Sequence, residues 1–227
     1  MAKRWLIGLS SGSSLNGVDA VLAGCDGLGL DLRLDLQHHL HLPYPRDLFP
    51  FMARIHGPAA QSLHQIALLH RLLGETFAEA VRRVADQARV NVTQVMAVAM
   101  AGHTLWHETE GRYPATLSLG MAEVIAEKAG LTTLSGFRGR DVAVGGQGFP
   151  LTALADYRMF HSPREDRVLI HLGGYATLLW LPAQGGPRQC VGFQAGPCGL
   201  LLDGLMRHVT GGKEVCDAGG KHAVQGR

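Results

Sequence analysis

The chain has 227 residues, 46% of them hydrophobic and 18% charged, which is the composition of a globular protein with a substantial core. Its formal net charge is +2 and its basic residues form no run, so we expect no nucleic-acid partner; no apolar run reaches membrane-spanning length, so we expect no membrane partner. The four cysteines form no Cys-x-x-Cys pair and the N-terminus carries no signal-peptide pattern, which predicts reduced thiols and a cytoplasmic location.

Two short apolar runs, at residues 5–9 and 18–22, flank a polar turn and predict two strands joined by that turn. The turn is rich in serine and glycine and ends with Asn16 and Asp19. Glycines let backbone amides approach a ligand closely, and hydroxyls add donors, so the turn suits the phosphates of a nucleotide. A plain hairpin turn uses the same residue types, and both interpretations stay open on chemistry alone.

Leucines alternate with polar residues from position 28 to position 42, which predicts a strand with one buried face. His39 and His41 share the polar face. The neighbouring sequence supplies no further metal ligand, so a solvated face is favoured over a metal site. Helices are expected at 46–55 and from position 61 onward, the second with an apolar stripe at helical spacing.

A short, fully apolar run at 95–101 predicts a buried central strand, and polar residues follow it directly at 102–108. Polar groups after a central strand are where α/β proteins place ligands. A helix at 122–129 and a short strand at 131–134 are expected next.

The composition changes near Gly136, where a glycine-rich segment with two arginines and an aspartate begins. We place the boundary between an N-terminal α/β domain, residues 1–135, and a partial second α/β domain, residues 136–227. A second strand–glycine turn–strand unit at 168–181 repeats the N-terminal pattern, which indicates a duplicated architecture. A helix is expected at 200–208.

Residues 7–19 read Ile-Gly-Leu-Ser-Ser-Gly-Ser-Ser-Leu-Asn-Gly-Val-Asp. This segment resembles the N-terminal signature of the anhydro-N-acetylmuramic acid kinase family, whose turn binds ATP. Other segments resemble later motifs of the same family in the same order, at residues 102–107, 137–151, 172–178, 192–203 and 216–227. The resemblance therefore covers essentially the whole chain.

The resemblance implies an α/β fold of the actin-like ATPase (ribonuclease-H-like) class, with one complete domain and the first part of a second. It implies ATP-dependent phosphorylation of 1,6-anhydro-N-acetylmuramic acid, with water opening the anhydro ring to give N-acetylmuramic acid 6-phosphate. ATP and Mg²⁺ are the implied cofactors, and the amino sugar is the second small-molecule partner.

The resemblance also implies roles for individual residues. Asp141 matches the base that activates the water; outside the motif, an aspartate flanked by arginines is usually a surface ion pair. The residues matched to ATP binding are Gly12, Ser13, Ser14, Leu15, Asn16, Gly17, Val18, Asp19, Gly173, Gly174 and Gly196. Those matched to substrate binding are Thr104, Arg138, Arg140, Gly146 and Gln147. Asp19 is also expected to hold Mg²⁺ through water.

Several motif positions have lost a polar group or changed it. They are Asn16 (Asp in the family), Ala101 (His), His103 (Gln), Gln194 and Ala195 (Asp and Thr), and Gly199 (Asn). One preorganised contact is worth about 10²–10³ in rate, so an alternative is a truncated or degenerate homologue that binds nucleotide or sugar without turnover. Family members continue past the position of the last residue, which predicts exposed apolar surface in the second domain and association with another chain, such as a homodimer.

Overall fold

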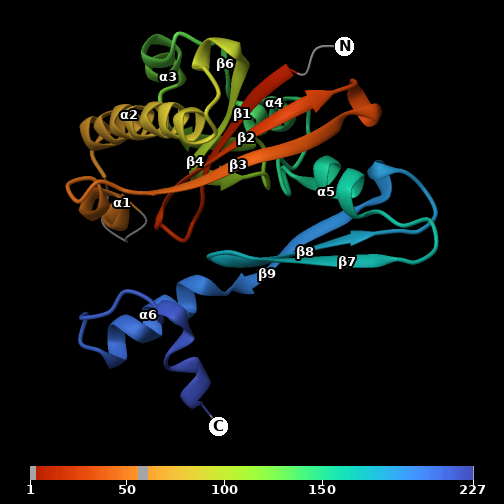
Figure 1. The fold of residues 1–227 in the computed structure, drawn as a ribbon. Helices are drawn as coiled ribbons and strands as arrows, with labels where there is room; N and C mark the ends of the chain where they lie inside the picture. The colour runs from red at the N-terminus through yellow and green to blue at the C-terminus, as the bar shows by residue number, and fades with distance from the viewer. Residues whose placement is uncertain (1–3, 56–60, 227) are drawn as a thin grey trace. The chain divides into compact units, whose positions relative to one another are not determined.

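A computed structural model of the chain describes residues 4–55 and 61–226 and is drawn in Figure 1. It divides into two compact units, residues 1–148 and 149–227. The boundary expected at 135/136 falls inside the first unit, because helix α4 (Phe137–Ala143) packs on strand β5 (Ala115–Leu119) of that unit. No helix in the described residues has both the length and the apolar character needed to cross a membrane.

The first unit is built around a six-stranded sheet. Its strands are β1 (Arg4–Ser11), β2 (Gly17–Asp26), β3 (Arg33–Pro43), β4 (Val95–Glu108), β5 and β6 (Thr133–Leu134). The order is β3-β2-β1-β4-β5, with β6 also paired to β4. The first three strands are antiparallel neighbours, and β4 runs parallel to β1. This mixed α/β topology agrees with the ribonuclease-H-like fold class that the family resemblance implies.

One face of this sheet is covered by helix α2 (Leu63–Gln87), with α1 (Phe49–Ile55) and α3 (Ala122–Ala129) beside it (Figure 1). Helix α2 begins with a capping box, in which the Ser62 hydroxyl accepts the Gln65 amide at 3.2 Å and the Gln65 side chain accepts the Ser62 amide. Alternate residues of β1 and β2 point toward α2 and are buried with its apolar stripe. The main core of the chain lies in this layer.

The leucine row of β3 does not form the single buried face that its alternation predicts. Leu40 and Leu42 pack against the core, but Leu34 and Leu36 are 57% and 65% exposed. The reason is a register shift opposite Leu22 and Ala23, where the extra residue Gln37 turns the earlier leucines to the other face of the sheet. The side chain of Leu30 lies outside the described residues, and Gly29–Asp31 form a 3-10 turn instead of strand.

The second unit contains a three-stranded antiparallel sheet and two helices. Its elements are α5 (Ala153–Phe160), β7 (Arg167–Leu172), β8 (Tyr175–Leu181), β9 (Val191–Pro197) and α6 (Gly199–Val209). Leu179 and Leu181 of β8 are 1% exposed on the face that α5 covers. On the opposite face Val168, Ile170 and Phe193 are more than half exposed. The sheet therefore has one covered and one exposed apolar face.

Candidate functional site

The loop between β1 and β2, residues 12–16, contains one glycine and two serines, Ser13 and Ser14. Its Leu15 amide donates to the Gly12 carbonyl at 3.3 Å, which closes a tight turn. Tight turns that expose clustered backbone amides bind anions, which is the basis of the phosphate-binding interpretation of this turn.

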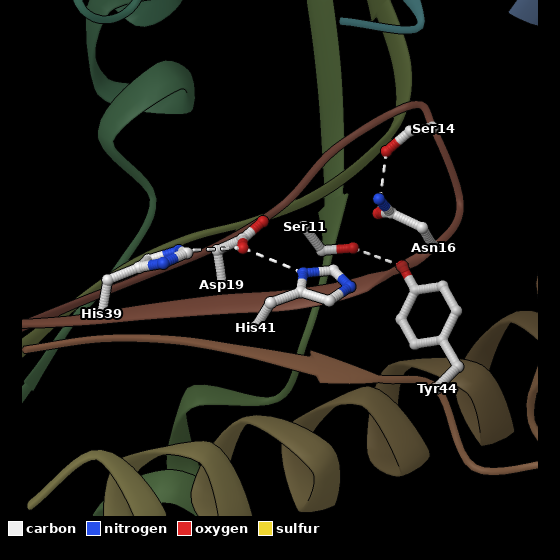
Figure 2. A network of polar contacts seen from close by, with 7 residues as sticks. All are labelled: Ser11, Ser14, Asn16, Asp19, His39, His41 and Tyr44. Atoms are coloured by element: carbon white, nitrogen blue, oxygen red, sulfur yellow. Dashed lines mark hydrogen bonds and ion pairs between the residues drawn. The ribbon is translucent and has the colours of Figure 1, made fainter. Parts of the chain in front are cut away.

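Asn16 and Gly17 shape the end of this loop. The Ser14 hydroxyl donates to Oδ1 of Asn16 at 2.8 Å, so the amide that replaces the family's carboxylate still serves as an acceptor (Figure 2). Gly17 has a φ of 152°, and a Cβ there would lie 2.3 Å from the Leu42 carbonyl oxygen. Glycine at 17 is therefore required by the close approach of β2 to β3.

Asp19 is held by two histidines of the neighbouring strand, as Figure 2 shows. His39 Nε2 and His41 Nδ1 both donate to Oδ1 of Asp19, at 3.2 and 3.0 Å. Asp19 pairs across the sheet with Ser10, which places it on the face opposite α2. The histidines are exposed, as expected, and the structure adds the carboxylate that they bind.

The neighbourhood of Asp19 fits indirect rather than direct metal binding. Among residues 4–55 and 61–226, no three histidines, cysteines or carboxylates come together in a way that could hold a metal ion. Mg²⁺ keeps several of its waters and is commonly held by one or two carboxylates together with substrate phosphates. Because both histidines bond Oδ1, the second carboxylate oxygen, Oδ2, remains for a metal-bound water.

Asp141 lies in α4, and the glycine-rich segment that follows folds back over its carboxylate. The amide of Gly148 donates to Oδ2 of Asp141 at 2.7 Å, and the amide of Gly146 donates to the Asp141 carbonyl at 2.9 Å. A Cβ at Gly146 would lie 2.2 Å from Oδ2. The segment thus holds the carboxylate by one oxygen and leaves Oδ1 able to accept a proton.

The two arginines beside Asp141 differ in their burial and in their hydrogen bonds. Arg138 Nη1 donates to the Gly148 carbonyl at 2.5 Å, and burial lowers the pKa of its guanidinium. Arg140 is exposed. No ion pair joins Asp141 to either arginine in the described structure, so the surface ion-pair interpretation does not account for this segment.

His107 of β4 joins the Asp141 segment, and the sequence interpretation did not include it. A Cβ at Gly148 would lie 3.3 Å from Cε1 of His107, and Nδ1 of His107 lies 3.3 Å from Oγ1 of Thr116. Burial lowers the pKa of His107, the charge of Arg138 lowers it further, and a backbone hydrogen bond with Gln147 opposes both. The sequence signal that could have indicated His107 is its position in residues 102–107, a segment that resembles a family motif.

A cavity of about 220 Å³ adjoins α4 within the first unit. Arg138, Glu123, Ser118 and Thr116 line it, together with Ala101, where the family has histidine. Its volume is below the range of about 300–1,000 Å³ that is usual for complete ligand pockets. Of the residues matched to substrate binding, Arg138 lines this cavity, whereas Thr104, Arg140, Gly146 and Gln147 do not.

The second glycine turn, Gly173 and Gly174, is bonded to the start of α6. The Gly173 carbonyl accepts the Gly199 amide at 3.0 Å, and the Gly174 carbonyl accepts the amides of Cys198 and Leu200. A Cβ at Gly199 would lie 2.9 Å from the Gly173 oxygen, so glycine permits this contact. These first amides of α6 are therefore engaged by the turn. Gly196, with a φ of 145°, lies nearby in β9.

The chain is similar to proteins of one known family along almost its whole length. The family model described as anhydro-N-acetylmuramic acid kinase matches residues 4–227. A protein named anhydro-N-acetylmuramic acid kinase from Salinibacter ruber is 37% identical over 231 residues, and one from Gloeobacter violaceus is 35% identical over 222. These alignments cover 99% and 97% of this chain, which spans 58% of the length of each relative.

Similarity to solved structures is weaker. A Ppx/GppA family member from Aquifex aeolicus is 10% identical with a TM-score of 0.40, covering 89% of this chain and 54% of that one. A ROK hexokinase from Thermus thermophilus is 13% identical with a TM-score of 0.35, covering 97% and 72%.

Proposed function

Because this chain belongs to the anhydro-N-acetylmuramic acid kinase family, we propose that it phosphorylates 1,6-anhydro-N-acetylmuramic acid with ATP and opens the anhydro ring with water. The product is N-acetylmuramic acid 6-phosphate, an intermediate in the recycling of cell-wall sugars. The family membership confirms the resemblance seen in the sequence. The observation that carries the proposal is the Asp141 carboxylate, held by the Gly148 amide over Gly146 in a segment resembling a family motif.

In the proposed reaction Asp141 is the general base. A water molecule gives a proton to Oδ1 of Asp141 while its oxygen attacks the anomeric carbon. The bond from that carbon to O6 breaks, and O6 takes the γ-phosphoryl group of ATP as ADP leaves. The hydrogen bond from the Gly148 amide fixes the orientation of the Asp141 carboxylate. Arg138 holds Gly148 itself in place by donating to its carbonyl oxygen.

In this proposal the serine- and glycine-rich loop at residues 12–16 binds phosphate oxygens of ATP. The family resemblance also gives Gly173 and Gly174 a role in nucleotide binding. Asp19 would orient a water of a bound Mg²⁺, with His39 and His41 holding its other oxygen. When bound, Mg²⁺ supplies neutralisation of phosphate charge, which is a large part of phosphoryl-transfer catalysis. A cytoplasmic location, where ATP is supplied, is part of the same proposal.

A second function is favoured by particular substitutions. Ala101 lines the cavity beside Arg138 where the family has histidine, and Gln194 and Ala195 replace an Asp-Thr pair in β9. Each change removes a group able to contact a ligand. A homologue that binds nucleotide or sugar without turnover would keep the glycine framework and lose such groups.

Mass spectrometry of the sugar after incubation with Mg-ATP tests the proposal. We expect a product heavier than the anhydro sugar by one water and one phosphoryl group. Asp141→Asn should abolish this product and leave ATP binding intact, whereas Asp47→Asn, an exposed residue outside the site, should change neither. Folded wild-type protein that binds ATP and forms no product would favour binding without turnover.

A further inference from the structure

Three buried polar side chains meet directly beneath the start of the loop at residues 12–16. Ser11 is the last residue of β1, Tyr44 follows the end of β3, and His103 lies in β4. They are 6%, 7% and 1% exposed. Three separate segments of the first unit therefore contribute one polar group each to a single buried position.

The Ser11 hydroxyl is the centre of this group. It contacts the Tyr44 hydroxyl, as Figure 2 shows, and lies 3.1 Å from Nδ1 of His103. A chain in which Tyr44 donates to Ser11 and Ser11 donates to Nδ1 of His103 satisfies both contacts. Burial raises the pKa of Tyr44, which keeps its phenol protonated as the donor.

The two ends of the loop are thus held from opposite faces of the sheet. Ser11 pairs with His103 across β1 and β4 and points to the face covered by α2. Asp19, just after the loop, points to the opposite face and is bonded by His39 and His41. The backbone of the loop leaves the sheet between the two residues that are held in this way, Ser11 and Asp19.

We propose that Ser11, Tyr44 and His103 are positioning residues that fix the loop at residues 12–16 for the phosphates of ATP. This inference rests on the proposed function. The loop amides bind phosphate only where the backbone places them, and that placement begins at Ser11. Buried hydrogen bonds from two other segments restrict the end of β1 far more than backbone pairing alone.

His103 stands where the family has glutamine, which allows a direct test of its role. A glutamine side chain can also offer an acceptor to the Ser11 hydroxyl, whereas leucine cannot. His103→Gln should therefore retain ATP binding, and His103→Leu should weaken it. If His103 only filled space, His103→Leu would bind ATP as well as His103→Gln or better, because leucine fills a buried space at least as well.

The mildest probe of the group is Tyr44→Phe, which removes one hydroxyl and keeps the ring in the core. Its matched control is Thr76→Val in α2, where a buried hydroxyl donates to the Leu72 carbonyl at 3.0 Å, apart from the loop. For each variant we would measure Mg-ATP affinity by calorimetry, kcat and the KM for the sugar, and amide hydrogen exchange of residues 10–19. Ser11→Ala provides a second, independent disruption.

We expect Tyr44→Phe and Ser11→Ala to weaken Mg-ATP affinity about five- to tenfold, the scale of one buried hydrogen bond. The KM for the sugar should stay unchanged, and exchange should rise in residues 12–16. Thr76→Val should lower the melting temperature and leave affinity and loop exchange as in the wild type. Unchanged affinity in both loop variants, or equal weakening by Thr76→Val, would overturn the proposal.

Hydrogen exchange separates this inference from the proposed function. If the wild type binds no Mg-ATP, the proposed function fails. Hydrogen exchange of the unliganded wild type and variants still shows whether Ser11, Tyr44 and His103 position the loop. A rise confined to the loop in Tyr44→Phe would support positioning. A rise spread evenly over the first unit, or no rise, would refute it.

Discussion

Gly146 leaves open the space that the Asp141 carboxylate occupies, since a Cβ at residue 146 would lie 2.2 Å from its Oδ2. The same oxygen accepts the Gly148 amide at 2.7 Å. Gly148 is restricted in turn, because its Cβ would lie 2.7 Å from Cγ of Arg138. Gly146 and Gly148 therefore make room for one carboxylate and for the side-chain stem of one arginine.

Gly146→Ala should displace the carboxylate and lower kcat by at least tenfold, with Mg-ATP affinity unchanged. The overlap should also cost about 1–3 kcal/mol of unfolding free energy. Steady-state kinetics and urea unfolding measure the two effects. The control is Gly204→Ala in α6, where a Cβ meets nothing within 4 Å and alanine should stabilise the helix by about 0.5–1 kcal/mol. A Gly146→Ala enzyme with normal kcat would remove Asp141 from its assigned role.

Local patterns predicted much of the fold. The alternation and turn residues of β1 and β2 and the helical spacing of α2 depend on neighbours in sequence, and all three elements lie where expected. The buried leucine face of β3 was predicted wrongly because the extra residue Gln37 reverses the facing of the strand. In the sequence, His38 interrupts the row of leucines next to the inserted residue, but a polar residue at one position does not by itself indicate a bulge.

The candidate site was predictable only where its parts are contiguous. Asp141, Gly146 and Gly148 lie within one short motif, and the structure brings them into contact. His107 approaches the same segment from β4, and His103 reaches Ser11 across the sheet. Contacts of this kind depend on strand register, which the residues of either strand alone do not specify.

Asp19→Asn should raise the Mg²⁺ concentration needed for half-maximal activity several-fold and leave the KM for the sugar unchanged. The reason is that an amide holds a metal-bound water less strongly than a carboxylate does. Titration of activity with Mg²⁺ at saturating ATP measures the effect. Asp26→Asn, at the other end of β2, is the control, since its carboxylate accepts the Gly27 amide away from the loop. Equal Mg²⁺ requirements in the two variants would argue against the role of Asp19.

The stability of the first unit should fall as the solution is acidified, and His107 should account for part of the loss. Its pKa is lowered from 6.5 in the folded protein, so the unfolded chain binds more protons there below pH 6.5. The stabilisation is present above that pH and is lost as the pH falls toward the folded value. In His107→Gln, urea unfolding at pH 7.5 and 5.5 should differ less than in the wild type. His64→Gln, exposed on α2, should retain the wild-type difference.

The exposed face of the β7–β9 sheet should make the chain self-associate as its concentration rises. Ile170 and Phe193 are 60% and 54% exposed on this face and flank Leu178 across the three strands. Water-exposed apolar area of this kind favours association. Sedimentation velocity over a concentration series should show the wild type shifting to larger species, and Ile170→Thr with Phe193→Thr should reduce the shift. Met96→Thr, which removes an equally exposed apolar side chain from β4, should leave the shift unchanged. A wild type that stays monomeric throughout the series would show that this face does not drive association.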